Sequence, residues 1–281
     1  MIGPKGHFNR LGKAAGAEED FVRVKHKPVL SEAAVRVGRV DPLFVDVHSH
    51  VVPSGDDGAQ SIEEGLELCR SAAGNGTAVL YATPHVWPML PLPPEREEAI
   101  RANHAELAPA AAGFGLDLRL GFELTPTPAL LEEDPNRFRL GDLPAVLMEV
   151  PFHGSLSLAE RLAEHIEAAG LVPVIAHPER SEAVLDDPAL AAGMAERGWL
   201  LQVNATSIVG YHGAEIEASA WRLVGDGLAN LVASDGHRRA RPPHLAEAFR
   251  AVQARLGEGA DALFDGRALP AGDRVDLAER R

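Results

Sequence analysis

The feature that most constrains the fold is a repeated alternation of short aliphatic runs with longer segments of helical pattern. The runs predict seven strands, at residues 43–47, 77–82, 116–121, 145–150, 171–176, 199–204 and 230–234. They are largely continuous in apolar character, which is typical of strands buried on both faces of a parallel sheet. No Rossmann glycine fingerprint accompanies them. Seven strand–helix repeats of this kind predict an α/β fold built as a closed or nearly closed barrel.

Composition fits one such barrel. The chain has 281 residues, 46% of them apolar, which is enough for a large core. Its single cysteine, Cys69, excludes an internal disulfide and every cysteine-cluster metal site. No run approaches the roughly 20 apolar residues of a transmembrane segment. The N-terminus also lacks the apolar segment of a secretory signal, so we expect a cytoplasmic protein.

Net charge is distributed unevenly along the chain. The net charge is −14, but residues 1–40 carry +4, which leaves −18 for the remainder. A body this acidic would repel a phosphate backbone, so we expect no nucleic-acid partner. All four lysines also lie before residue 28. We predict a flexible extension at 1–42, one domain at 43–257 and a C-terminal tail at 258–281.

Metal-binding residue types recur where the predicted strands end, and barrel enzymes place their chemistry there. The first strand ends in alternating Asp46, His48 and His50, which should share one face because side chains in a strand alternate. In the following loop we prefer Asp57 to Asp56 as a ligand. Later strand ends carry His85, Glu123, Glu149, His153, His177, Glu179, Asn204, Asp235 and His237. These residue types at six strand ends predict a site for divalent metal.

Five short segments and one strand end carry a family resemblance. They are the Asp46–His50 pattern, the loop Gly55–Ala59, the segments Ala82–His85, Ala176–Arg180 and Ala233–His237, and the strand end at Glu123. Together they resemble the polymerase-and-histidinol-phosphatase (PHP) superfamily and, more narrowly, bacterial capsule-locus tyrosine-protein phosphatases of the CpsB/CapC type. The resemblance covers residues 43–256 and implies a distorted (β/α)7 TIM-like barrel, in agreement with the seven predicted strands.

The resemblance also implies three divalent metal ions, usually manganese, with iron, zinc or magnesium as other possibilities. One ion would be held by His48, His50, Glu123 and Asp235, a second by Glu123 and His177, and the third by Asp57, His85 and His237. Three departures from the family pattern stand out. The family usually begins close to its first His-x-His, so residues 1–42 have no counterpart. Val86 replaces a second histidine found in many members, and the loop that follows it is rich in proline.

The reaction implied is hydrolysis of a phosphomonoester, with a metal-bridging hydroxide as the nucleophile. The expected catalytic residues are Glu123, His177 and Arg180, whose guanidinium can bind phosphate oxygens in a fork. The implied partner is the phosphotyrosine tail of a polysaccharide-assembly tyrosine kinase. Cysteine-based phosphatase chemistry is excluded because it needs Cys-x5-Arg, and Asn75 stands six residues after Cys69.

Three other readings remain open at this point. The first is a PHP-type small-molecule phosphatase, such as histidinol phosphatase. The second is an amidohydrolase-like metal hydrolase, whose binuclear sites are commonly bridged by a carboxylated lysine. Since the body has no lysine, Glu123 would have to be that bridge. The third is a metal-binding module without turnover, which predicts losses among the eight ligand positions, and none is lost.

Overall fold

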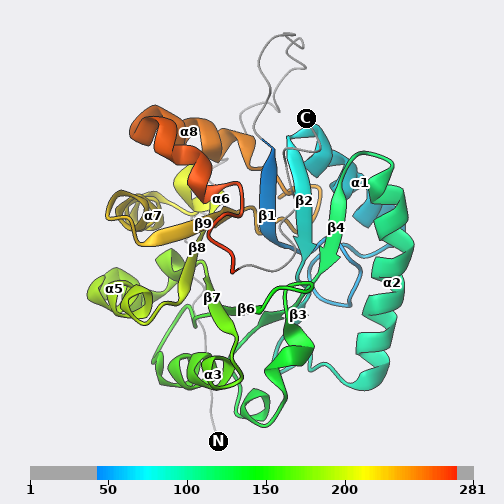
Figure 1. Cartoon of the computed structure of the whole chain (residues 1–281), viewed down its shortest axis with the longest axis horizontal. Helices are drawn as coiled ribbons and strands as arrows, with labels where there is room; N and C mark the ends of the chain where they lie inside the picture. The colour runs from blue at the N-terminus through cyan, green and yellow to red at the C-terminus, as the bar shows by residue number, and fades with distance from the viewer. Residues whose placement is uncertain (1–42, 271–281) are drawn as a thin grey trace, which may run out of the picture. The chain divides into compact units, whose positions relative to one another are not determined.

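The computed structural model describes residues 43–270, so the predicted extension at 1–42 and residues 271–281 of the predicted tail lie outside the described residues. Nine parallel strands form the centre of this part of the chain (Figure 1). They are β1 (Phe44–Ser49), β2 (Thr77–Ala82), β3 (His85–Val86), β4 (Asp117–Leu120), β5 (Glu123–Leu124), β6 (Ala145–Glu149), β7 (Val172–Ala176), β8 (Leu200–Asn204) and β9 (Ala229–Ala233).

Seven of the nine strands lie at the predicted positions, and the other two, β3 and β5, are two-residue strands just beyond the predicted ends at residues 82 and 121. The strands form two sheets, with the orders β1-β2-β4 and β3-β5-β6-β7-β8-β9. β3 directly continues β2, and β5 directly continues β4. At one break Pro84 has no N–H to donate. At the other, a Cβ on Gly121 would lie 2.7 Å from Leu140 Cδ2, so a larger residue there would displace the Leu140 side chain.

Hydrogen bonds across the breaks and across the outer strands close the barrel. Gly121 N donates to Ala82 O at 2.8 Å, and Glu123 N donates to Pro84 O at 3.1 Å. At the other junction, β1 and the end of β9 meet where His50 N donates to Gly236 O at 2.7 Å. The predicted distorted (β/α)7 barrel is therefore confirmed, with its distortion located at the two broken strands.

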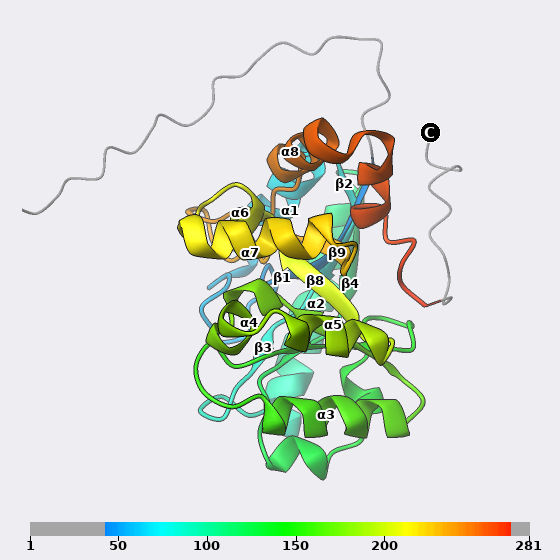
Figure 2. The ribbon, with the colours of Figure 1, turned by 90° about the vertical axis from the view of Figure 1, so that its left-hand side faces the viewer.

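Helices cover the outside of the strands. Figure 1 shows α1 and α2 on one side and α3, α5, α7 and α8 on the other, and Figure 2 views the second group face on. None of the helices in 43–270 is long and apolar enough to cross a membrane. The α-helices are α1 (Ile62–Gly74), α2 (Pro94–Ala112), α3 (Ser157–Ala168), α4 (Glu182–Asp186), α5 (Ala189–Glu196), α6 (Ala205–Ile208), α7 (Ala214–Gly225) and α8 (Ala246–Leu256). Short 3-10 helices are η1 (Ala129–Leu131), η2 (Pro135–Phe138), η3 (Pro178–Arg180) and η4 (Gly257–Leu263).

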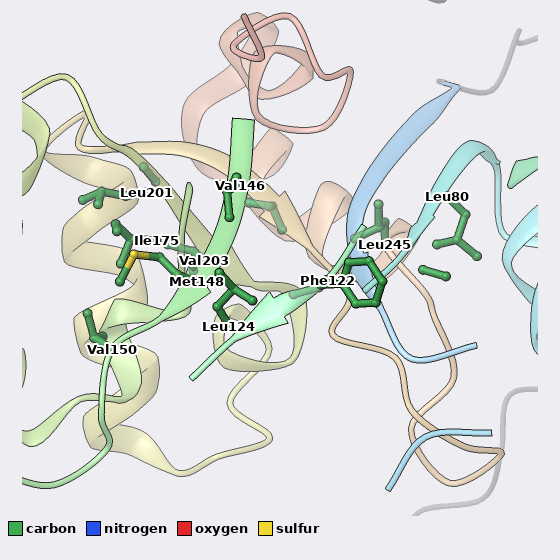
Figure 3. Close-up of a cluster of buried hydrophobic side chains, with 14 of the residues drawn as sticks. Leu80, Phe122, Leu124, Val146, Met148, Val150, Ile175, Leu201, Val203 and Leu245 are labelled. Atoms are coloured by element: carbon green, nitrogen blue, oxygen red, sulfur yellow. The ribbon is translucent and has the colours of Figure 1, made fainter. Parts of the chain in front are cut away.

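Alternate strand residues separate the core into two layers. Val146 and Met148 of β6 belong to the cluster between strands and helices, which Figure 3 shows in part. Ala145 and Leu147 of the same strand belong to a second cluster inside the barrel. Glu123 is paired with Leu147 across β5 and β6, so its side chain shares the interior face.

The packed chain extends beyond residue 257, the domain boundary predicted from the sequence. η4 follows α8, and Phe264 after it is buried against Phe44 and Phe249. Val45 N also donates to Phe264 O at 2.8 Å. The first residues of the predicted tail therefore complete the core beside β1.

Candidate metal centre

Four histidines surround one buried carboxylate at the carboxyl ends of the barrel strands. Glu123 Oε2 lies 3.1 Å from His48 Nε2, 3.3 Å from His50 Nε2 and 2.8 Å from His85 Nδ1. Glu123 Oε1 lies 3.0 Å from His177 Nε2. These imidazoles come from the ends of β1 and β7 and from β3, so three separate parts of the chain converge on Glu123.

Asp235, which follows β9, is the second carboxylate of the cluster. Its Oδ1 lies 3.5 Å from Nε2 of both His48 and His50, and 3.3 Å from Nδ1 of His237. Its Oδ2 accepts a hydrogen bond from Asn204 Nδ2 at 2.8 Å. Asp235 therefore links the β1 histidines to His237.

The third part of the cluster lies nearer to solvent. Asp57 Oδ1 lies 3.3 Å from His237 Nε2 and 3.6 Å from His85 Nε2, and the Asp57 side chain is 60% exposed. The centroid of the His50 ring lies 3.9 Å from that of the His237 ring and 4.2 Å from that of the His85 ring. Asp57 therefore lies beside His85 and His237 at the exposed side of the cluster.

All eight predicted ligand residues meet in this one region. Seven of them fall into three overlapping groups whose ligand atoms lie within 4.8 Å of one another. The groups differ from the predicted sets in three ways: they share His48 and His50, Glu123 occurs in one group rather than two, and Asp57 belongs to none. They are His48, Glu123 and His177; His48, His50 and Asp235; and His50, His85 and His237.

The chemistry of these side chains fits divalent metal ions. Glu123 Oε2 is close to three ring nitrogens, yet neither this oxygen nor His85 Nδ1 makes a hydrogen bond of acceptable geometry. Leaving a buried charge unsatisfied costs several kcal/mol. Burial alone would raise the pKa of Glu123, but the His48 and His85 imidazoles outweigh it and hold that pKa well below its ordinary value. A carboxylate kept ionised among imidazoles is the donor set that Mn²⁺, Fe²⁺ and Zn²⁺ accept.

Side chains behind the cluster fix the orientation of its histidines. Gln202 Oε1 lies 2.9 Å from His48 Nδ1, and Gln202 Nε2 donates to Asn204 Oδ1 at 2.8 Å. Asp56 Oδ2 lies 3.4 Å from His50 Nδ1 and accepts from His85 N at 3.0 Å. Sequence reasoning missed Gln202, although an amide inside the aliphatic run of β8 is a signal of such a role.

Backbone strain marks the same site. His177 has φ 36° and ψ 50°, and Asp235 has φ 50°; within residues 43–270 these are the non-glycine residues with positive φ. Such a conformation costs about 1–3 kcal/mol and persists where the surroundings impose it, often at functional sites. His177 follows β7 and Asp235 follows β9, and both side chains lie in the cluster.

Asp46 is a correction to the sequence interpretation. Asp46 pairs with Leu80 and Ser49 with Ala82, so three steps along β1 match two along β2. This bulge breaks the alternation on which a shared face depended. Asp46 Oδ1 accepts hydrogen bonds from the backbone N–H groups of Ser234 and His48, at 3.0 and 3.3 Å. Asp46 thus ties β1 to the end of β9 and is outside the metal-ligand groups.

Two arginines reach the same carboxylate. Arg180 Nη1 lies 3.4 Å and Arg241 Nη1 lies 3.6 Å from Asp235 Oδ2. Arg180 has the expected place at the cluster, whereas Arg241 was not predicted. Glu179, beside Arg180, accepts from Ser207 Oγ at 2.7 Å and Asn204 N at 3.0 Å, so it braces the loop after β7.

The seven-strand barrel and its centre of histidines and carboxylates define the chain as a PHP-type barrel protein. Residues 44–264 match the family model described as capsular polysaccharide synthesis, CpsB/CapC. The chain belongs to this family. Tyrosine-protein phosphatase YwqE of Bacillus subtilis is 31% identical over 225 residues, covering 76% of this chain and 85% of YwqE. Tyrosine-protein phosphatase CpsB of Streptococcus pneumoniae is 27% identical, covering 76% of this chain and 91% of CpsB.

Solved structures agree with the fold. One, from work on YwqE and CpsB as metal-dependent tyrosine phosphatases, matches with a TM-score of 0.72 and 27% identity, over 80% of this chain and 92% of that one. An inactive dihydroorotase-like domain of Chaetomium thermophilum matches with a TM-score of 0.52 at 10% identity, over 79% of this chain and 77% of that one. The second likeness concerns the fold alone.

Proposed function

We propose that this chain is a metal-dependent tyrosine-protein phosphatase that hydrolyses phosphotyrosine to tyrosine and phosphate. The observation that carries the proposal is the convergence of four imidazoles on Glu123. The metal-dependent tyrosine phosphatases YwqE and CpsB, which cover most of this chain, support the same activity.

The proposed ligands are the eight residues predicted from the sequence. His48, His50, Glu123 and Asp235 would hold one divalent ion, Glu123 and His177 a second, and Asp57, His85 and His237 a third. Manganese is the ion we propose. When bound, such ions withdraw charge from phosphoryl oxygens and lower the pKa of water.

Residues of the chain itself would orient the substrate and the ligands. Arg180 lies next to Asp235 at the edge of the cluster, and its side chain is 19% exposed. Its guanidinium can therefore donate hydrogen bonds to phosphoryl oxygens. Gln202 accepts the Nδ1 proton of His48 and thereby leaves Nε2 free as a ligand. Burial of the cluster strengthens each of these charge interactions.

The substrate that we propose is the phosphotyrosine tail of a polysaccharide-assembly tyrosine kinase. The family's description as capsular polysaccharide synthesis supports this partner. A kinase of this kind uses ATP, so we place the reaction in the cytoplasm.

The test is phosphate release by the full-length chain from a phosphotyrosyl peptide and from histidinol phosphate, after metal removal and reloading with Mn²⁺. We expect Mn²⁺-dependent hydrolysis that favours the peptide, and a loss of at least 100-fold in His177→Ala. Preference for histidinol phosphate would assign the small-molecule alternative. Inactivity of the metal-loaded protein would refute the phosphatase assignment.

A further inference from the structure

Two aromatic rings border the metal centre without belonging to its ligand set. The centroid of the Trp87 ring lies 4.1 Å from that of the His85 ring, and the centroid of the Phe152 ring lies 5.6 Å from that of the His177 ring. His85 and His177 approach different oxygens of Glu123. The two aromatic side chains therefore border the cluster at two different imidazoles, one in the loop after β3 and one in the loop after β6.

Phe152 is placed unlike the phenylalanines of the core. It is 37% exposed, whereas Phe122, Phe138 and Phe264 are at most 2% exposed. Trp87 is also partly exposed. Large apolar side chains exposed at a site of buried charge indicate contact with an apolar group of a ligand.

The chemistry of the proposed reaction identifies that group. Metal ions and Arg180 contact the phosphoryl group, which is the same in every phosphomonoester, so they cannot distinguish one alcohol from another. Because Trp87 and Phe152 lie next to His85 and His177, a ring attached to that phosphoryl group can stack on an aromatic side chain at either imidazole. Offset or edge-on aromatic pairs of this kind are favourable beyond the area that they bury.

We propose that Phe152 and Trp87 form an aryl-recognition site, which makes this centre selective for phosphate esters of phenols, the tyrosine side chain included. The inference rests on the proposed phosphatase function and specifies which residues select the leaving group.

Phe152 has a second contact that the test must separate. The Arg180 guanidinium carbon lies 4.5 Å from the centroid of the Phe152 ring, a cation–π contact that helps to position Arg180. Replacing Phe152 therefore weakens phosphoryl contacts as well, for every substrate. The ratio of kcat/KM between an aryl and an alkyl ester cancels this shared effect and isolates the contact with the ring.

The experiment compares phenyl phosphate with glycerol phosphate as substrates of the full-length, Mn²⁺-loaded protein. In Phe152→Leu and in Trp87→Leu we expect the aryl-to-alkyl ratio of kcat/KM to fall about five-fold, which corresponds to ~1 kcal/mol. Phe152→Tyr, which keeps a ring, should hold the ratio near that of the wild type. Leu256→Ala, on the exposed end of α8, is the control for loss of an apolar side chain.

A second readout measures binding without turnover. The inhibition constant of phenylphosphonate, relative to that of methylphosphonate, should rise by the same factor in both leucine variants. Equal losses on both substrates, or an unchanged ratio, would overturn the aryl-recognition site while leaving the phosphatase assignment intact. A wild type that hydrolyses neither phosphotyrosyl peptide nor phenyl phosphate would overturn the proposed function first, and the selectivity with it.

Discussion

Gln202 holds His48 from behind: its Oε1 lies 2.9 Å from His48 Nδ1, with both side chains completely buried inside the barrel. Nδ1 donates this hydrogen bond, so the lone pair of His48 is on Nε2, the nitrogen that faces Glu123 and Asp235. The second nitrogen of a metal-binding histidine is commonly held in this way. One amide thus selects the tautomer that the centre needs.

Gln202→Leu should weaken metal binding by about 10–100-fold, because His48 loses the acceptor that fixes its ring. Gln202→Glu, which retains an oxygen for Nδ1, should keep more of the affinity. Competition with a chelator during Mn²⁺ titration measures both. Gln253→Leu on α8 serves as the control, and equal affinity in wild type and Gln202→Leu would contradict the positioning role.

Arg180→Ala should lower kcat for phosphotyrosyl peptide by about 100-fold, since it removes one charged donor at the phosphoryl group. Arg180→Lys should recover part of this loss, because an ammonium supplies charge without the fork. Steady-state kinetics with measured metal content separates this effect from loss of metal. Arg250→Ala, on the exposed face of α8, should match the wild type. Full activity of the Arg180→Ala protein would exclude a role for Arg180 in binding the phosphoryl group.

Cys69 should have no part in catalysis. It is completely buried in α1, and burial raises the pKa of its thiol to about 12, so the reactive thiolate is absent near neutral pH. Cys69→Ala should retain kcat/KM and lose about 1 kcal/mol of stability through the small cavity it creates. Iodoacetamide should not inactivate the native enzyme. Inactivation that Cys69→Ala abolishes would contradict this expectation.

His104 should make stability depend on pH. Burial lowers the pKa of His104 below 6.5, while its Nε2 lies 3.0 Å from Leu118 O. Below pH 6.5 the unfolded chain therefore binds a proton that the folded chain does not, and stability falls until the pH reaches the folded pKa. The slope is at most about 1.4 kcal/mol per pH unit.

Urea unfolding of the metal-free protein at pH 7.5 and pH 5 tests this prediction. His104→Gln keeps a donor for Leu118 O but cannot titrate, so it should lose less stability between the two pH values than the wild type. His153→Gln, whose ring is 80% exposed in the wild type, is the matched control. An identical pH dependence in wild type and His104→Gln would exclude His104 as the cause.

The aliphatic runs and the polar residues that end them were sufficient to predict the barrel and the edge where those polar residues meet. Parallel strands in a barrel end at the same edge, so residues as distant as His48 and Asp235 had to come together once the topology was right. Strand breaks escaped prediction because β3 and β5 are two residues long. Two residues cannot establish a period, and only contacts with neighbouring strands define them.

Side-chain orientation behind the cluster was also beyond the sequence. The bulge in β1, which separates Asp46 from the histidines, arises from pairing with β2 and has no local signal. Gln202 and Arg241 contact the centre from β8 and from the loop after β9. An amide inside an aliphatic run marks Gln202 as unusual, but the sequence does not specify which side chain either residue contacts. Tertiary contacts determine such positions, whereas periodicity determines the strands that carry them.

The most direct test of the metal centre is anomalous X-ray diffraction at the manganese edge from crystals of Mn²⁺-loaded protein. We expect three anomalous peaks among the eight proposed ligands, with Glu123 between two of them. His177→Ala should remove the peak assigned to Glu123 and His177. Absence of peaks at full metal loading, or peaks away from Glu123, would contradict the assignment of this cluster as the metal centre.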